Sequence, residues 1–297
     1  MQNNSIKKEL ESIIKEENTN ADIKISIYDI NKKTGIDVNG NKIGWSASII
    51  KIPVMISVLN EIDKGMLTLN TSLKIDHKFT LEQGDFVSLL EDGTYMGVKD
   101  LLEYMIIDSD NEATNILADC IGGPRKINRD MHKLKLKKSM LGHLLCPNVP
   151  RYKNIFYNRN GSNITTPNDM VNVMRHIYDQ KLNIISNKVK YTSDKILSLT
   201  SSGLVYDKRF KDHIIKTKIG FISDLEDGSD MNEVGIIDDN LIYCVMANKI
   251  NREVICKSNP PYWMKETESM CYSNMSEIIK VRRVYDKFSK ILADNFL

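Results

Sequence analysis

Alternating apolar and polar residues near the N-terminus predict a strand. The stretch ADIKISIYDI at 21–30 alternates as a half-buried strand does, and the turn-rich TGIDVNGNK follows it. The two segments together predict a β-hairpin, which a short polar helix precedes.

From residue 46 to about 209 the pattern has a helical period instead. Apolar residues recur every three to four positions in the segments IIKIPVMISVLNEIDKGM, VKDLLEYMIIDS, NEATNILADCIGG and TPNDMVNVMRHIYDQ. This block predicts a helical lobe.

Strand patterns return at 213–222, 233–238 and 241–248, the last two separated by an Asp-Asp-Asn turn, and an amphipathic helix ends the chain. A sheet drawn from both chain ends predicts an α+β fold, in which helices flank an antiparallel sheet and an active site lies in the cleft beside an inserted all-α lobe. We expect 1–45 and 210–297 to form the sheet lobe and 46–209 the helical lobe, together one domain.

Composition and charge exclude some classes of function. The 297 residues are 41% apolar and 27% charged, as in globular proteins, and a formal net charge of +2 gives no overall signal for nucleic-acid or membrane binding. The five cysteines form no CxxC pair, which favours free, mostly buried thiols, and we expect neither a metal nor a cofactor.

The N-terminal sequence MQNNSIKKELESIIKEEN lacks the apolar run of a signal peptide, and no stretch approaches the ~18 apolar residues of a spanning helix. As written, the chain is expected to be cytoplasmic, with no membrane segment. It would be extracellular or attached to the cell surface if an export signal has been removed.

Ser48 and Lys51 form the first candidate site, in the stretch SASIIKIPVM. Positions i and i+3 share a helix face, so the Lys51 amine can lie beside the Ser48 hydroxyl, and Pro53 places both near a helix start, where an oxyanion is stabilised. The Ser-x-x-Lys pattern alone is weak, because Ser5 and Lys8 also match it. The stretch GWSAS lacks the closing glycine of a G-x-S-x-G hydrolase motif.

Two further motifs follow in order. Ser109-Asp110-Asn111 lies between two predicted helices, and Lys218-Ile219-Gly220 lies on a predicted strand. With these three motifs the sequence resembles the class A β-lactamase and penicillin-binding serine enzyme superfamily, whose motifs are S-x-x-K, S-D-N and K-T-G. The flanking segments are similar as well, so the resemblance spans roughly residues 20–296 and implies a β-lactamase/transpeptidase-like fold.

The resemblance implies a role for each motif residue. Ser48 would become acylated, and Lys51 would take its proton once Lys218 and partial desolvation lower the Lys51 pKa. Ser109 would relay a proton to the leaving nitrogen and Asn111 would bind the substrate's side-chain amide, while Asp110 would be structural. The backbone N–H groups of Ser48 and Phe221 would form the oxyanion hole, and Gly220 would let the substrate approach the strand.

The third motif departs from the family pattern. Ile219 replaces the threonine whose hydroxyl helps bind a substrate carboxylate. Reading the motif as Lys216-Thr217-Lys218 restores the threonine but puts lysine where glycine is needed, so we favour Lys218.

A larger departure concerns the glutamate that activates the deacylating water in class A enzymes. From Met131 to Asn168 the chain has no Asp or Glu, although its average composition would place about five there. His143 is a candidate substitute base, although a lone histidine is more often a packing or capping residue. The segment's basic residues are either a solvated face or a rim that attracts anionic substrates; they are Lys133, Lys135, Lys137, Lys138, Arg151, Lys153 and Arg159.

These observations predict a monomeric serine hydrolase of class A type, acylated at Ser48 by a small β-lactam, peptide or ester substrate, with slow deacylation. Two alternatives remain open: a D-alanyl-D-alanine peptidase or esterase on the same scaffold, and a β-lactam-binding sensor or trap that is acylated once. If water is activated after all, Glu82, Glu91, Glu103 and His143 are the groups to test.

Overall fold

The computed structural model describes residues 2–77, 85–145, 163–200, 203–222, 228–250, 254–257, 270–273 and 276–297. Within these residues the α-helices are α1 (Gln2–Glu17), α2 (Lys51–Asp63), α3 (Val98–Ile107), α4 (Asn111–Cys120), α5 (Gly123–Lys133), α6 (Pro167–Tyr178), α7 (Asn187–Leu197) and α8 (Ser276–Phe296). Short 3-10 turns are η1 (Ala47–Ile50), η2 (Val87–Leu89) and η4 (Lys208–Asp212).

The main sheet has five antiparallel strands in the order β2-β1-β9-β8-β7. They are β1 (Asp22–Asp29), β2 (Thr34–Val38), β7 (Ile215–Ile222), β8 (Ser229–Ile237) and β9 (Leu241–Ile250). Three two-stranded pairs add β3 (Gly44–Trp45) with β6 (Ile164–Thr165), β4 (Ser72–Lys74) with β5 (Tyr95–Gly97), and β10 (Val254–Lys257) with β11 (Met270–Ser273). The predicted antiparallel sheet from both chain ends is therefore confirmed.

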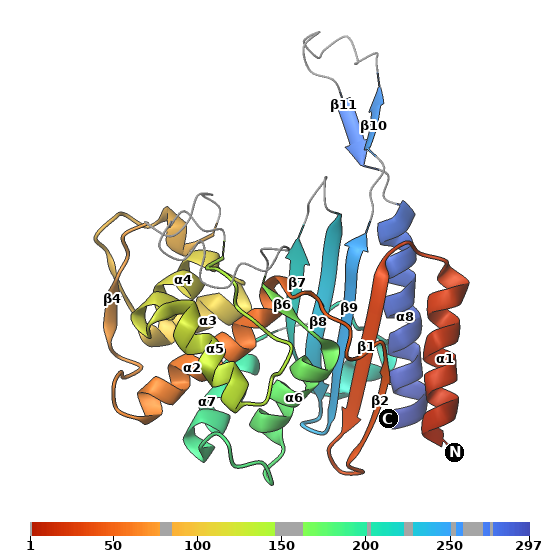
Figure 1. The fold of residues 1–297 in the computed structure, drawn as a ribbon, viewed down its shortest axis with the longest axis horizontal. Coiled ribbons are helices and arrows are strands. Elements are labelled where there is room, and N and C mark those ends of the chain that lie inside the picture. The colour runs from red at the N-terminus through yellow and green to blue at the C-terminus, as the bar shows by residue number, and fades with distance from the viewer. Residues whose placement is uncertain are drawn as a thin grey trace.

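Two hydrophobic cores cover the two faces of the sheet. α1 and α8 lie side by side on one face, and their core includes Leu10 and Phe288 (Figure 1). The helices from α2 to α7 lie on the other side, where α6 packs directly on the sheet and Ile50 and Met174 belong to the second core. Because both faces are covered, every residue of β8 is buried.

Strand β8 begins four residues before the predicted start at Glu233. The polar residues Asp230 and Asn232 interrupt the apolar pattern, so the sequence does not show that this buried strand already begins before Glu233. The predicted turn after β8 is confirmed: Asp238 and Asp239 both have positive φ, as in the turns that suit the twist of β-hairpins.

The placement of the lobe boundaries at residues 45 and 210 stays a prediction. Two cysteines have described side chains, and both are free thiols: Cys244 is buried as expected, whereas Cys120 is exposed. Within the described residues, no helix combines the length and apolar character needed to cross a membrane.

Candidate active site

Ser48 lies in the 3-10 turn η1, immediately before α2. Ser48 therefore lies close to a helix start, as Pro53 predicts, and the α-helix itself begins at Lys51. In a 3-10 turn, residues i and i+3 are eclipsed, so the turn still brings the two side chains to the same side. Ala47, just before Ser48, has a φ of +45°, a strained conformation for alanine that is often found at functional sites.

Lys51 links the first motif to the second. Its side chain is fully buried, and its Nζ donates hydrogen bonds to Ser109 Oγ at 3.1 Å and to Asn111 Oδ1 at 2.8 Å, as well as to the Ser109 carbonyl. Ser109, between α3 and α4, also has a positive φ of 60°. A lysine amine therefore lies within hydrogen-bonding distance of a serine hydroxyl, as a proton relay requires.

Asp110 has the structural role expected of it. One carboxylate oxygen caps α4 by accepting the Ala113 N–H at 2.8 Å, and the other accepts the Val87 N–H at 2.9 Å. These bonds fix the start of α4 and so the position of Asn111.

Lys218 lies on β7, the edge strand of the sheet, and is buried. Burial lowers the pKa of its ammonium to about 8, and the nearby Asp108 carboxylate opposes that shift. Lys216 is engaged elsewhere, in ion pairs with Asp194 and Asp239. These contacts favour Lys218 over Lys216 as the lysine of the third motif.

A cavity of about 400 Å³ joins the three motifs. One wall comes from the segment around α3 and α4. The other wall comes from β7 and from Thr200. The lining residues are Ser48, Asp85, Ile106, Ile107, Asp108, Ser109, Asn111, Thr200, Thr217, Lys218, Ile219 and Phe221. The lining includes side chains of all three motifs, and the buried Lys51 donates hydrogen bonds to two of them, Ser109 and Asn111.

Gly220 lies against the Ser48 turn. A Cβ atom on residue 220 would lie 2.7 Å from Ser48 N, closer than Cβ atoms approach in real structures, and a tight 3.0 Å from both Ala47 Cβ and Ile49 N. Only glycine allows this approach of β7 to η1. The Ser48 N–H is thereby held beside the edge strand that carries Phe221, and the pairing of these two N–H groups as an oxyanion hole stays a prediction.

A buried carboxylate that the sequence analysis did not single out holds the residue before Lys218. Glu233 accepts hydrogen bonds from Thr217 Oγ1 at 2.8 Å, from Tyr243 Oη at 2.7 Å and from two backbone N–H groups at 204 and 205. Burial raises the pKa of this carboxyl group. Because Thr217 is fixed in this way, Glu233 acts as a positioning residue for β7.

Three of the four substitute bases proposed from the sequence have described positions, and none of these three lines the Ser48 cavity. His143 Nδ1 contacts the Leu144 carbonyl, Glu103 lines a neighbouring cavity, and neither they nor Glu91 lines the cavity at Ser48. Glu82 lies outside the described residues. Two carboxylates that the sequence analysis missed, Asp85 and Asp108, do line it.

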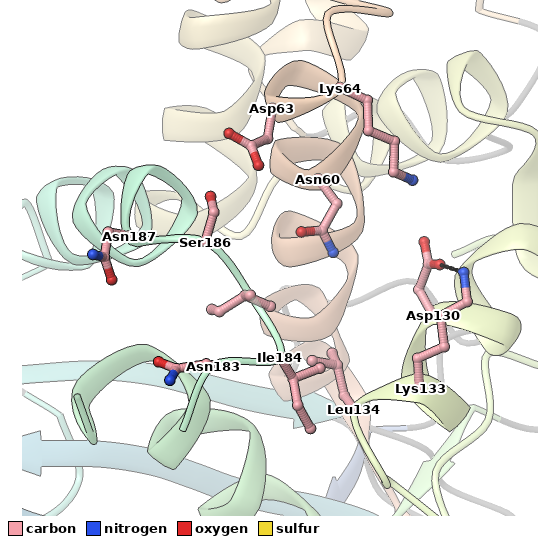
Figure 2. Close-up of a pocket in the computed structure, with 11 residues that line it drawn as sticks. Asn60, Asp63, Lys64, Asp130, Lys133, Leu134, Asn183, Ile184, Ser186 and Asn187 are labelled. Carbon is pink, nitrogen blue, oxygen red and sulfur yellow. Dashed lines mark hydrogen bonds and ion pairs between the residues drawn. The ribbon is translucent and has the colours of Figure 1, made fainter. Parts of the chain in front are cut away.

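The described lysines of the acid-free segment form no rim around Ser48. Those at 133, 135, 137 and 138 are all exposed, and none lines the Ser48 cavity. Lys133 lines a separate cavity of about 570 Å³ at the opposite end of α2, where it pairs with Asp130 (Figure 2). Arg151, Lys153 and Arg159 lie outside the described residues. A solvated face therefore accounts for the four lysines.

Comparison with known proteins agrees with the motifs. The chain is 24% identical to β-lactamase VEB-1 of Pseudomonas aeruginosa over 223 residues, which cover 73% of this chain and 70% of that enzyme. Its fold matches that of PBP-A with a TM-score of 0.75 at 17% identity, over 98% of this chain and 96% of that one. It also matches a β-lactamase from Chitinophaga pinensis DSM 2588 with a TM-score of 0.74 at 18% identity, over 98% of both chains.

A variant of PBP-A, with a TM-score of 0.72 at 17% identity over 98% of this chain and 97% of that one, was solved as an acyl-enzyme complex with penicillin G. The model of the β-lactamase enzyme family matches residues 5–260, which is most of the chain. The superfamily resemblance that the three motifs indicated and the predicted fold class are thus confirmed. The chain belongs to the β-lactamase enzyme family as a serine β-lactamase-like hydrolase.

Proposed function

We propose that Ser48 opens the ring of β-lactams, forms an acyl-enzyme and releases the product slowly. The observation that carries this proposal is that Lys51 Nζ is hydrogen-bonded to Ser109 Oγ and Asn111 Oδ1, two residues that line the same cavity as Ser48. The penicillin acyl-enzyme of the PBP-A variant supports the substrate class. That the chain acts as a monomer stays a prediction.

In the acylation step, Lys51 acts in its neutral form, whose two N–H groups donate to Asn111 Oδ1 and the Ser109 carbonyl and whose lone pair is left to accept a proton. Ser48 Oγ attacks the β-lactam carbonyl carbon while this amine accepts the hydroxyl proton. The N–H groups of Ser48 and Phe221 stabilise the oxyanion. As the carbon–nitrogen bond breaks, the proton moves from Lys51 through Ser109 Oγ to the ring nitrogen. Lys218, across the cavity, binds the substrate carboxylate without the help of a hydroxyl at residue 219.

Intact-mass spectrometry over time after adding benzylpenicillin tests the proposal. We expect the protein to gain the mass of one benzylpenicillin quickly and to lose it slowly. Turnover of esters alone would instead indicate the peptidase or esterase function, and an adduct that never leaves would indicate a sensor or trap. If no adduct forms and the drug is not consumed, the proposed function is wrong.

Gly220→Ala should slow the acylation of Ser48 by about 100-fold, because a displacement of β7 by even an ångström misplaces the reacting groups. The new methyl group would meet backbone at Ser48 and Ile49, which cannot rotate away. Gly35→Ala on β2 is the matched control, since its Cβ would be in ordinary contact at 3.4 Å. Acylation rates from intact mass should fall for the first variant only; equal rates would show that β7 does not need this approach.

A further inference from the structure

The Ser48 cavity contains two carboxylates that the proposed acylation step does not use. Asp108 ends α3 and is exposed, and Asp85 precedes η2 and is half-buried. Both line the cavity together with Ser48, on the wall that carries Ser109 and Asn111. Their charges therefore act on whatever the cavity binds.

The two carboxylates differ in their surroundings. Asp108 lies close enough to Lys218 to oppose the lowering of its pKa, so these two groups partly compensate each other. Asp85 forms no ion pair with any residue in the described part of the chain, and the Lys51 amine is directed to Ser109 and Asn111. Within the described residues, Asp85 thus adds to the cavity a negative charge that no ion pair compensates.

The contact of Asp85 with Asn111 indicates that Asp85 faces the acyl group of the substrate. Its Oδ2 accepts the backbone N–H of Asn111 at 2.6 Å, so the carboxylate lies beside the residue proposed to bind the amide of the acyl group. Lys218, which we assign to the ring carboxylate, lies on the opposite wall, on β7. A cation in the acyl group would meet Asp85, whereas an anion there would be repelled.

We propose that Asp85 makes this enzyme select β-lactams whose acyl group carries a protonated amine next to the amide carbonyl. The inference rests on the proposed function, because it assumes that Ser48 is acylated in this cavity. It adds a specificity-determining residue that no motif of the sequence contains.

Ampicillin and benzylpenicillin test the proposal, because they differ only by the amine in the acyl group. The readout is the ratio of their second-order acylation rate constants, measured in one protein preparation. Wild type should favour ampicillin, and Asp85→Asn should lower the ratio about fivefold, the size of a solvent-screened charge pair. The asparagine oxygen can still accept the Asn111 N–H, so the wall of the cavity is retained.

Two further variants test whether the charge of Asp85 causes the preference for ampicillin. Asp85→Glu keeps the charge and should keep most of the preference, whereas Glu91→Gln removes an exposed carboxylate outside the cavity and should leave the ratio at the wild-type value. High salt should weaken the preference of wild type, since Asp85 is only half-buried.

The outcomes separate the two claims. If wild type is acylated by both penicillins and Asp85→Asn leaves their ratio unchanged, this inference is wrong and the proposed function stands. If neither penicillin acylates wild type, both are wrong. Partial unfolding of a variant cannot imitate the expected result, because it lowers both rate constants equally and leaves their ratio intact.

Discussion

Ser48→Ala should abolish covalent labelling by benzylpenicillin, because no other hydroxyl in the described cavity combines a position before a helix start with a lysine three residues later. The variant should still fold, since an alanine in a half-exposed turn changes the free energy of unfolding by only about 0.5 kcal/mol. Intact-mass spectrometry after prolonged incubation measures the labelling.

Ser57→Ala provides the matched control. Ser57 lies on α2, is fully buried, and its Oγ has no hydrogen-bond partner in the described part of the chain. Replacing it should leave labelling at the wild-type level. An adduct on Ser48→Ala, located by peptide mapping, would assign the nucleophile to another residue.

The motifs could be predicted to meet because each carries its own local signal. Pro53 marks a helix start, Asp110 is a typical N-cap residue, and Gly220 interrupts an apolar strand. These signals place the polar side chains of the three motifs near the ends of helices and strands, where a cleft between a sheet and helices brings them together. The structure adds the contacts between them, above all those of Lys51.

Other features had no such signal. Glu233 reads as a polar residue at a strand end, yet it is fully buried, because four donors from three separate segments converge on it. Asp85 lies in a turn-rich stretch 26 residues before its partner Asn111, and no periodicity connects the two. Lys216 and Lys218 share one face of β7, so strand alternation could not decide between them.

These missed carboxylates bear on how the acyl-enzyme breaks down. The segment 131–168 supplies no carboxylate, and among the described residues the cavity offers only Asp85, which is bonded to the Asn111 N–H, and Asp108, which lies close to Lys218. Each carboxylate therefore already interacts with another residue of the cavity wall.

We therefore expect the acyl-enzyme to accumulate, with a burst of one equivalent of product followed by slow turnover. Removing a positioned general base typically costs ~10²–10⁴-fold in the step it serves. Among the described residues only deacylation lacks such a base, since acylation uses Lys51 and Ser109. Stopped-flow measurements with a chromogenic cephalosporin give the burst amplitude and the slow rate together. Fast linear hydrolysis without a burst would contradict the expectation and show that some group does activate water. Asp85→Asn and Asp108→Asn should then be compared first, because a base in the cavity would be identified by the variant that restores the burst.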